Sequence, residues 1–106
     1  MTTIRFQFRE HEIRSVEFTG HAGYGEAGED IVCSAVSSAV MLADALLEDV
    51  WGIPIEQEVE EEAPRIRLSL PKGSHWEKAQ DAFQALLLHF RALKEEYPDF
   101  IEVLEV

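Results

Sequence analysis

Cys33 and His21, two side chains that can act as a nucleophile and its base, lie twelve positions apart in this sequence. The thiolate is the reactive form of cysteine, and an imidazole can accept the thiol proton. A cysteine–histidine pair can therefore cleave an acyl bond through a covalent intermediate. Such pairs meet in space rather than in sequence, so the elements around them must be worked out first.

The segment that contains both residues predicts a loop followed by a helix. Four of the six glycines lie in it, namely Gly20, Gly23, Gly25 and Gly28. Glycine clusters are typical of loops whose backbone adopts conformations closed to other residues. Asp30 then has the chemistry of an N-cap, and a long apolar-periodic run follows it. This places Cys33 in the first helical turn, where backbone N–H groups stabilise negative charge.

Two further polar residues can join this site. Ser37 lies one helical turn after Cys33, on the same helix face. Asp30 can order the helix start or orient His21, although its negative charge near the sulfur disfavours the thiolate. Both are supporting candidates.

Other interpretations of the same residues remain open at this point. A lone cysteine in an apolar helix is usually a small core residue, and a lone loop histidine is usually solvated. A glycine-rich loop before a helix is also generic for anion binding, but the Lys-Ser/Thr of a P-loop is missing here. A zinc hydrolase needs three or four ligands, and only His21 and Cys33 are close in sequence. We therefore expect neither a metal nor another cofactor.

A longer motif adds a family resemblance. The residues Gly20-His21-Ala22, the glycines after them, and Glu-Asp-Ile-Val-Cys-Ser-Ala-Val-Ser at 29–37 resemble the signature of the ribosomal-processing cysteine protease family, often called Prp. The resemblance spans nearly the whole chain. It implies a cytoplasmic bacterial endopeptidase with His21 and Cys33 as the catalytic dyad, and with Asp30 and Ser37 in supporting roles.

The resemblance also implies a substrate and an assembly. Relatives remove a short N-terminal extension from a large-subunit ribosomal protein, and they are typically homodimers. Because that extension ends in apolar and aromatic residues, a shallow hydrophobic groove beside Cys33 is expected. The alternative is a non-catalytic module that binds a ribosomal protein or the assembling ribosome, with the loop as a grip and Cys33 buried.

Composition narrows the class of protein. A chain of 106 residues predicts a single domain over 1–106, and one cysteine excludes an internal disulfide, as suits a reducing cytosol. No uninterrupted apolar run reaches about 18 residues, so we expect no membrane span. A formal net charge of −12 disfavours direct nucleic-acid binding and favours a basic protein partner.

The chain around the site predicts two strands, a helix, two strands, a helix and a strand. Residues 4–9 alternate cleanly and pair with an antiparallel strand at 13–19, in which Ile13 is out of phase and indicates a bulge or an irregular start. The first helix covers 31–50, with Val50 on its apolar face, and Gly52 ends it.

The second half of the chain completes this order. Strands around 55–59 and 66–70 are expected to turn Ile55, Gln57 and Val59, and then Ile66, Leu68 and Leu70, inward. The acidic run 56–62 is expected to be a solvated strand face opposite arginines rather than a metal site.

A capping box formed by Ser74 and Glu77 starts a helix over 75–97, with Trp76 buried. A last strand at 100–106 is expected to turn Phe100, Leu104 and Val106 to one face. Together the pattern predicts an α+β domain with one mainly antiparallel sheet and two packed helices.

Overall fold

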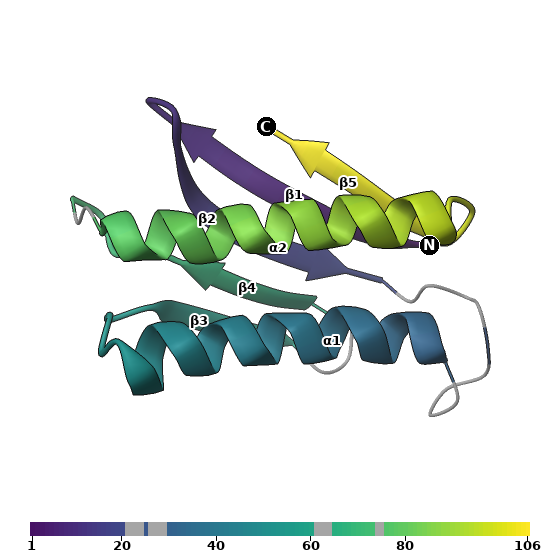
Figure 1. Cartoon of the computed structure of the whole chain (residues 1–106), viewed down its shortest axis with the longest axis horizontal. Coiled ribbons are helices and arrows are strands. Elements are labelled where there is room, and N and C mark those ends of the chain that lie inside the picture. Colours follow the sequence, from purple (N-terminus) through teal and green to yellow (C-terminus); the bar gives the residue numbers. More distant parts are fainter. Residues whose placement is uncertain (21–24, 26–29, 61–64, 74–75) are drawn as a thin grey trace.

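The protein is one five-stranded sheet with two helices packed on one face, as the computed structural model shows in Figure 1. The structure describes residues 1–20, 25, 30–60, 65–73 and 76–106. The elements follow the chain as β1 (Thr2–Arg9), β2 (Glu12–Thr19), α1 (Ile31–Asp44), η1 (Ala45–Val50), β3 (Glu56–Glu60), β4 (Arg65–Ser69), α2 (Glu77–Glu96) and β5 (Ile101–Glu105). The predicted element order and the α+β class are confirmed.

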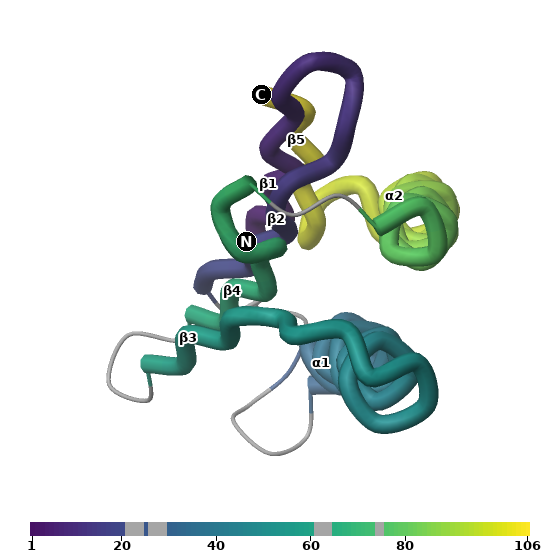
Figure 2. Tube along the Cα trace, turned by 90° about the vertical axis from the view of Figure 1, so that its left-hand side faces the viewer, coloured from purple at the N-terminus to yellow at the C-terminus, as the bar shows by residue number. Residues whose placement is uncertain are grey.

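The sheet has the strand order β3-β4-β2-β1-β5. Three of its four pairings are antiparallel, and β5 runs parallel to β1. Figure 2 shows the sheet from its side, with α1 and α2 on the same face. Within the part of the chain that the structure describes, the other face of the sheet carries no helix.

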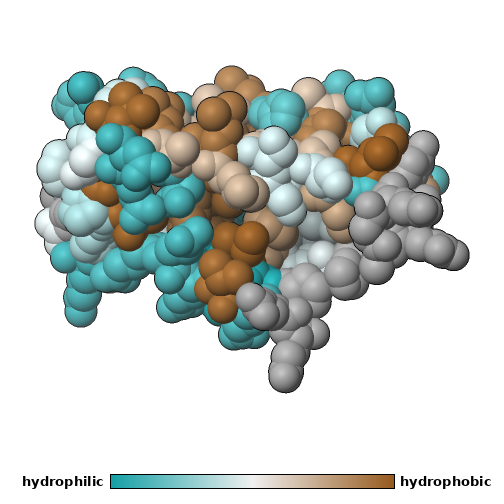
Figure 3. All heavy atoms as spheres, turned by 90° about the horizontal axis from the view of Figure 1, so that it is seen from below, coloured by the Kyte–Doolittle hydropathy of each residue, from teal (hydrophilic) through white to brown (hydrophobic). Residues whose placement is uncertain are grey.

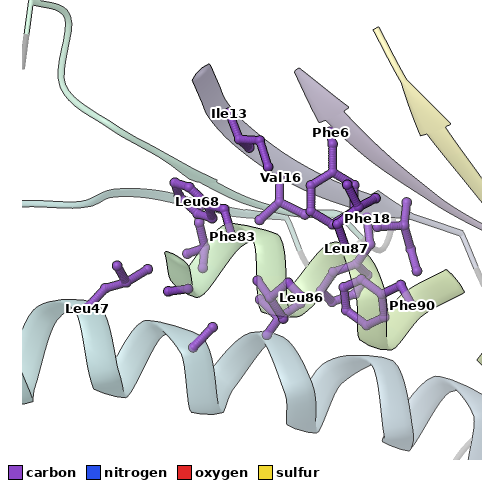
Figure 4. Close-up of a cluster of buried hydrophobic side chains, with 14 of the residues drawn as sticks. Phe6, Ile13, Val16, Phe18, Leu47, Leu68, Phe83, Leu86, Leu87 and Phe90 are labelled. Atoms are coloured by element: carbon purple, nitrogen blue, oxygen red, sulfur yellow. The ribbon is translucent and has the colours of Figure 1, made fainter. Parts of the chain in front are cut away.

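The core lies between this sheet and the two helices. Figure 4 shows side chains of β1 and β2 pointing toward those of α2. The rings of Phe6 and Phe90 lie 6.2 Å apart between their centroids, and neither is exposed. Leu47 and Leu68 extend the core toward η1 and β4. A buried aromatic pair of this kind stabilises the contact beyond its apolar area.

The bulge predicted in the hairpin is confirmed. Gln7 pairs with Ser15, but its neighbour Phe8 pairs with Ile13, so Arg14 is the extra residue. The bulge returns Ile13 to the buried face of β2. The break in the apolar alternation at Ile13 thus correctly indicated an extra residue in this strand.

The first helix changes its winding before it ends. Its last six residues, η1, form a π-helix, and the Trp51 N–H donates to Leu46 O at 3.0 Å, five residues back. The wider turn rotates later side chains away from the α-helical face. Val50 is therefore 71% exposed, and its predicted burial was wrong. Gly52, with φ at +66°, follows the helix end as predicted.

The segment Ile31–Val50 is long and apolar enough to cross a membrane by length and composition alone. Here it packs as a core helix, with Val32, Val36 and Val40 buried against the sheet side. Only 28% of its most apolar window is buried, however, so much of its apolar surface stays outside the core.

The second helix begins at Glu77, two residues later than predicted. Trp76 is the extended residue before it and is exposed, not buried. Because Glu77 is the first helical residue, it cannot be the third residue of the predicted capping box. The proposed cap Ser74 lies outside the described residues.

In the two edge strands, β3 and β5, the sets of buried residues differ from those that the sequence predicted. All five residues of β3 are exposed, including Gln57 and Val59, whereas Ile55 just before the strand is buried. The reason is that two helices cover the middle of the sheet and leave this edge strand uncovered.

In β5, Ile101 is buried and Val103 packs against the core, so the predicted face with Leu104 and Val106 was wrong. Laterally paired residues share a face, and Ile101 pairs with the buried Thr2.

Candidate active site

The start of α1 is built by Asp30. Its backbone is extended and its Oδ1 accepts hydrogen bonds from the N–H groups of Val32 and Cys33, both at 3.0 Å. Its carbonyl accepts from Ser34 N–H at 3.0 Å, the first bond of the helix. Asp30 is therefore the N-cap, and Cys33 is the third residue of α1, as predicted.

Asp30 also contacts the glycine-rich segment. Its Oδ2 accepts from the N–H of Gly25 at 3.4 Å. Gly25 is exposed, whereas Asp30 is buried. One carboxylate thus joins the helix start to the loop that carries His21 in the sequence.

Cys33 lies at the edge of the core and remains partly exposed. Its Sγ is 3.9 Å from Oγ1 of Thr2, the first residue of β1. Thr2 is 1% exposed, and its hydroxyl donates to Gly20 O at 3.5 Å. The sulfur therefore faces a buried hydroxyl on one side while part of its side chain meets solvent.

Thr2 is the site residue that the sequence interpretation missed. It is separated from Cys33 by 31 positions, so no local motif joins the two. One signal was available, because Thr2 shares the alternation of Ile4 and Phe6 and is thus a polar residue on the buried face of β1.

Gly20 holds the end of β2 against the start of β1. Its φ is +83°, and a Cβ built on it would lie 2.8 Å from the carbonyl oxygen of Met1. Only glycine fits without a shift of the backbone. Gly20 is one of the predicted loop glycines, and it marks the point where the chain leaves the sheet toward His21. Glycine is required there because the backbone of Met1 lies too close for a side chain.

The remaining predicted residues divide into two groups. Ser37 is half-buried in α1, one turn after Cys33. His21, Gly23 and Gly28 lie outside the described residues. The pairing of His21 with Cys33 therefore stays a prediction.

Two backbone N–H groups at the start of α1 already donate hydrogen bonds, and this limits the donors that the helix start can offer to a substrate. Because the N–H groups of Val32 and Cys33 both donate to Asp30, they are not available to a substrate oxygen while the cap is intact. Ile31 N–H, the first of the helix, is not engaged in this cap. Among the described residues, no group of three or more His, Cys, Asp or Glu side chains has the arrangement of a metal site.

An apolar groove lies between α1 and α2, but not beside the sulfur. Cys33 is not among its lining residues, because the groove follows the other face of α1 from Ala35 to Leu46. The hydrophobic groove expected beside Cys33 therefore stays a prediction.

Comparisons with known proteins agree with the motif. A family model described as cysteine protease Prp matches residues 1–102. The ribosomal processing cysteine protease Prp of Bacillus subtilis is 27% identical over 100 residues, which is 90% of this chain and 89% of that protein.

Solved structures share the fold. A Staphylococcus aureus ribosomal processing protease Prp, in complex with a covalently linked product peptide, has a TM-score of 0.89 and 21% identity, with full coverage of both chains. A Streptococcus mutans protein has a TM-score of 0.84 and 32% identity, over 100% of this chain and 96% of that one.

Proposed function

The chain belongs to the Prp family of cysteine proteases, and from this premise we propose that it removes a short N-terminal extension from a large-subunit ribosomal protein. The name of the Bacillus subtilis relative supports ribosomal processing. The Staphylococcus aureus relative, solved with a substrate peptide and with a covalently linked product peptide, supports a peptide as the substrate. Family membership favours this proposal over the non-catalytic binding module.

In the proposed reaction, Cys33 is the nucleophile and His21 the acid–base group. His21 takes the thiol proton as the sulfur attacks the carbonyl carbon of the scissile bond. The C–N bond then breaks, His21 gives the proton to the departing amine, and a thioester remains on Cys33. Water, deprotonated by His21, attacks the thioester and releases the acid with regeneration of the thiol.

The stabilisation of the oxyanion has to come from donors that the cap does not use. Asp30 occupies two first-turn N–H groups, so it acts by holding the helix start in place and not by leaving those donors open. We assign the role to Ile31 N–H together with donors of the glycine-rich segment. Such preorganised donors typically contribute about 2.7–4 kcal/mol each to transition-state stabilisation.

The observation that carries this proposal is the position of Cys33. Cys33 is a partly exposed residue in the first turn of a capped helix, in a chain whose family is that of cysteine proteases. A core cysteine would be sealed among apolar side chains; here the sulfur lies beside a hydroxyl at the edge of the core.

We base the proposed partners, location and assembly of the enzyme on its net charge and its family. A net charge of −12 attracts a basic protein such as a ribosomal protein and opposes contact with nucleic acid or anionic membranes. We place the enzyme in the cytoplasm as a homodimer.

The test is mass spectrometry of the candidate ribosomal protein from the same organism before and after incubation with this enzyme. We expect the mass to fall by that of an N-terminal peptide with the wild-type enzyme and to stay unchanged with Cys33→Ala. Cleavage by Cys33→Ala, or an intact substrate with the wild-type enzyme, would contradict the proposal.

A further inference from the structure

The strand β3 forms one edge of the sheet and has a neighbour on one side only. It pairs with β4, and among the described residues no other strand lies along its outer side. All five of its residues are exposed. Alternate residues of an edge strand direct their N–H and C=O groups outward, where an extended chain of another molecule can pair with them. The edge of β3 is therefore a place where a further strand can be added.

The glutamates of β3 lie on one face of the sheet. Glu56, Glu58 and Glu60 are on the face opposite the helices, because Leu68, which pairs with the residue between the first two, is buried in the core. Figure 3 views the molecule from the side on which α1 and β3 lie, and it shows hydrophilic surface gathered beside the apolar surface of the helix. The edge thus combines unpaired backbone groups with a row of carboxylates.

Arg65 holds these carboxylates in place without neutralising them. Its guanidinium donates to Glu58 Oε2 at 3.0 Å, to Glu60 Oε1 at 3.3 Å and to Glu17 Oε2 at 2.8 Å. One positive charge therefore faces three negative charges. In the described part of the chain, the second oxygens of Glu58 and Glu60 accept no hydrogen bond, and Glu56 forms no ion pair. These positioned oxygens can accept from the ammonium or guanidinium groups of a ligand.

The charge of the edge selects its partner. Two copies of the chain would bring like charges together along this edge, and a nucleic acid or an anionic membrane would meet the same repulsion. A basic extended segment fits instead. With Lys or Arg at every second position it places cations opposite the glutamates, and the neutral or apolar residues between them meet Val59, which is 55% exposed.

The edge of β3 ends on the same side of the sheet as Cys33. β3 and β2 run in the same direction, because both are antiparallel to β4. One row of paired residues crosses four strands at this end, namely Glu60, Arg65, Thr19 and Thr3. Thr3 directly follows the threonine whose hydroxyl lies 3.9 Å from the sulfur. Three strand spacings of about 4.8 Å place Glu60 roughly 14 Å from Thr3, a span of about four or five extended residues.

We infer that the edge of β3 is a second binding site for the substrate, where a basic extended segment pairs with residues 56–60 while the scissile bond lies at Cys33. This rests on the proposed function, because the segment belongs to the part of the ribosomal protein that follows the cleaved extension. It begins about five residues after the scissile bond and continues for about five more. The site adds binding energy that is equal in the ground state and the transition state, so it lowers KM and leaves kcat unchanged.

Amide hydrogen exchange of the wild-type protein, followed by NMR, tests the edge without any cleavage. The probe is the synthetic peptide acetyl-Lys-Thr-Lys-Val-Lys-Thr-Lys-amide in about 50 mM NaCl. We expect it to slow exchange at alternate amides of residues 56–60 by at least about 10-fold, because strand pairing protects the outward N–H groups. The peptide with glutamate in place of each lysine should give no protection.

The backbone contribution can be measured separately from the charge. Methylation of every second peptide nitrogen can be placed in two alternations, and both keep all four lysines. Only one alternation should abolish binding, because only one set of N–H groups in an added strand faces β3. Equal binding of the two methylated peptides would contradict strand pairing.

The combined change Glu56→Gln and Glu58→Gln tests the charge. It should weaken peptide binding, and raise KM for the full-length ribosomal protein, by about 5- to 10-fold with kcat unchanged. The matched control is the combined change Glu95→Gln and Glu96→Gln at the end of α2, which removes the same charge from exposed positions. It should alter both quantities less than about twofold, because those carboxylates lie off the edge. Circular dichroism of both variants should match the wild type.

Three outcomes would overturn the inference. They are a peptide that protects no amide of β3 at about 1 mM; binding that the α2 variant weakens as much as the β3 variant; and protection of the same amides without peptide as the protein is concentrated, which would show that the edge pairs with another copy. The proposed function fails separately. Absence of ribosomal-protein cleavage, with β3 still protected by the peptide, would count against the substrate, whereas cleavage with an unaltered KM in the β3 variant would count against the edge site.

Discussion

The hydroxyl oxygen of Thr2 lies 3.9 Å from the sulfur of Cys33, across 31 residues of sequence. The contact exists because the start of β1 meets the end of β2 at Gly20, next to the start of α1. A buried hydroxyl thus fixes one side of the nucleophile. The site is formed by the sheet as much as by the helix that carries the cysteine.

Thr2→Val should lower kcat/KM by about 2- to 10-fold, because valine keeps the shape of the side chain but lacks the hydroxyl that positions the sulfur. This range corresponds to the loss of one hydrogen bond, whose net contribution is about 0.5–1.5 kcal/mol. Thr2→Ser should restore most of the activity. The matched control is Thr3→Val, which removes the neighbouring hydroxyl that donates to Glu102 on β5 and should leave kcat/KM unchanged. Equal rates for Thr2→Val and the wild type would show that the hydroxyl does not position Cys33.

Asp30→Ala should lower the free energy of unfolding by about 0.5–2 kcal/mol, because two N–H groups of α1 lose their acceptor. Asp30→Asn keeps a capping oxygen and should lose less. Urea unfolding monitored by circular dichroism measures both. An equal loss in the two variants would indicate that the charge of Asp30, and not its capping geometry, stabilises the helix start.

Gly20→Ala should be more destabilising than the same change at Gly73. Both residues have φ near +80°, but a Cβ at Gly20 meets Met1 O at 2.8 Å, whereas at Gly73 nothing lies within 4 Å. Gly73→Ala should cost about 1 kcal/mol for the backbone conformation alone, and Gly20→Ala about 1–3 kcal/mol more. Thermal unfolding of both variants gives the comparison, and similar losses would contradict the close approach.

Glu48→Gln should stabilise the protein at pH 7. The pKa of Glu48 is raised because its side chain shares a hydrogen bond with Asp44, and because burial and the charges of Asp44 and Asp49 disfavour its ionised form. Two carboxylates can share that bond only when one is protonated, and among the described residues Asp44 Oδ1 is a buried side-chain oxygen without a hydrogen-bond partner. Glutamine supplies an N–H donor at any pH.

The direction of the pH effect follows from the raised pKa. Stability contributed by protonated Glu48 is complete below its unfolded pKa of about 4.5 and is lost as pH rises through the higher folded value. Glu48→Gln should therefore gain about 0.2–0.5 kcal/mol at pH 7 and almost nothing near pH 4. Glu56→Gln, on exposed β3, changes the net charge equally and should show no such difference. A constant gain at both pH values would exclude the shared proton.

Local features were predictable from the sequence because their causes are local. The cap at Asp30, the bulge beside Ile13 and the helix end at Gly52 each depend on residues within one or two turns. The opposed charges of β3 and β4 were also predictable, and Arg65 indeed bonds Glu58 at 3.0 Å and Glu60 at 3.3 Å.

Features set by distant packing were not predictable. The exposure of Val59 depends on how far two helices extend across a sheet, and the face of β5 depends on its parallel register with β1. Thr2 joins the site only because three chain segments converge, and η1 departs from the α-helical period that the apolar pattern of the sequence follows.

The most direct test of the central claim is the rate of Cys33 alkylation by iodoacetamide in the folded protein, measured from pH 5 to 9. A nucleophile that is reachable and paired with a base should react quickly near neutral pH, and His21→Ala should slow that reaction. A thiol that resists iodoacetamide until the protein unfolds, or rate–pH curves that coincide for the wild type and His21→Ala, would contradict the account.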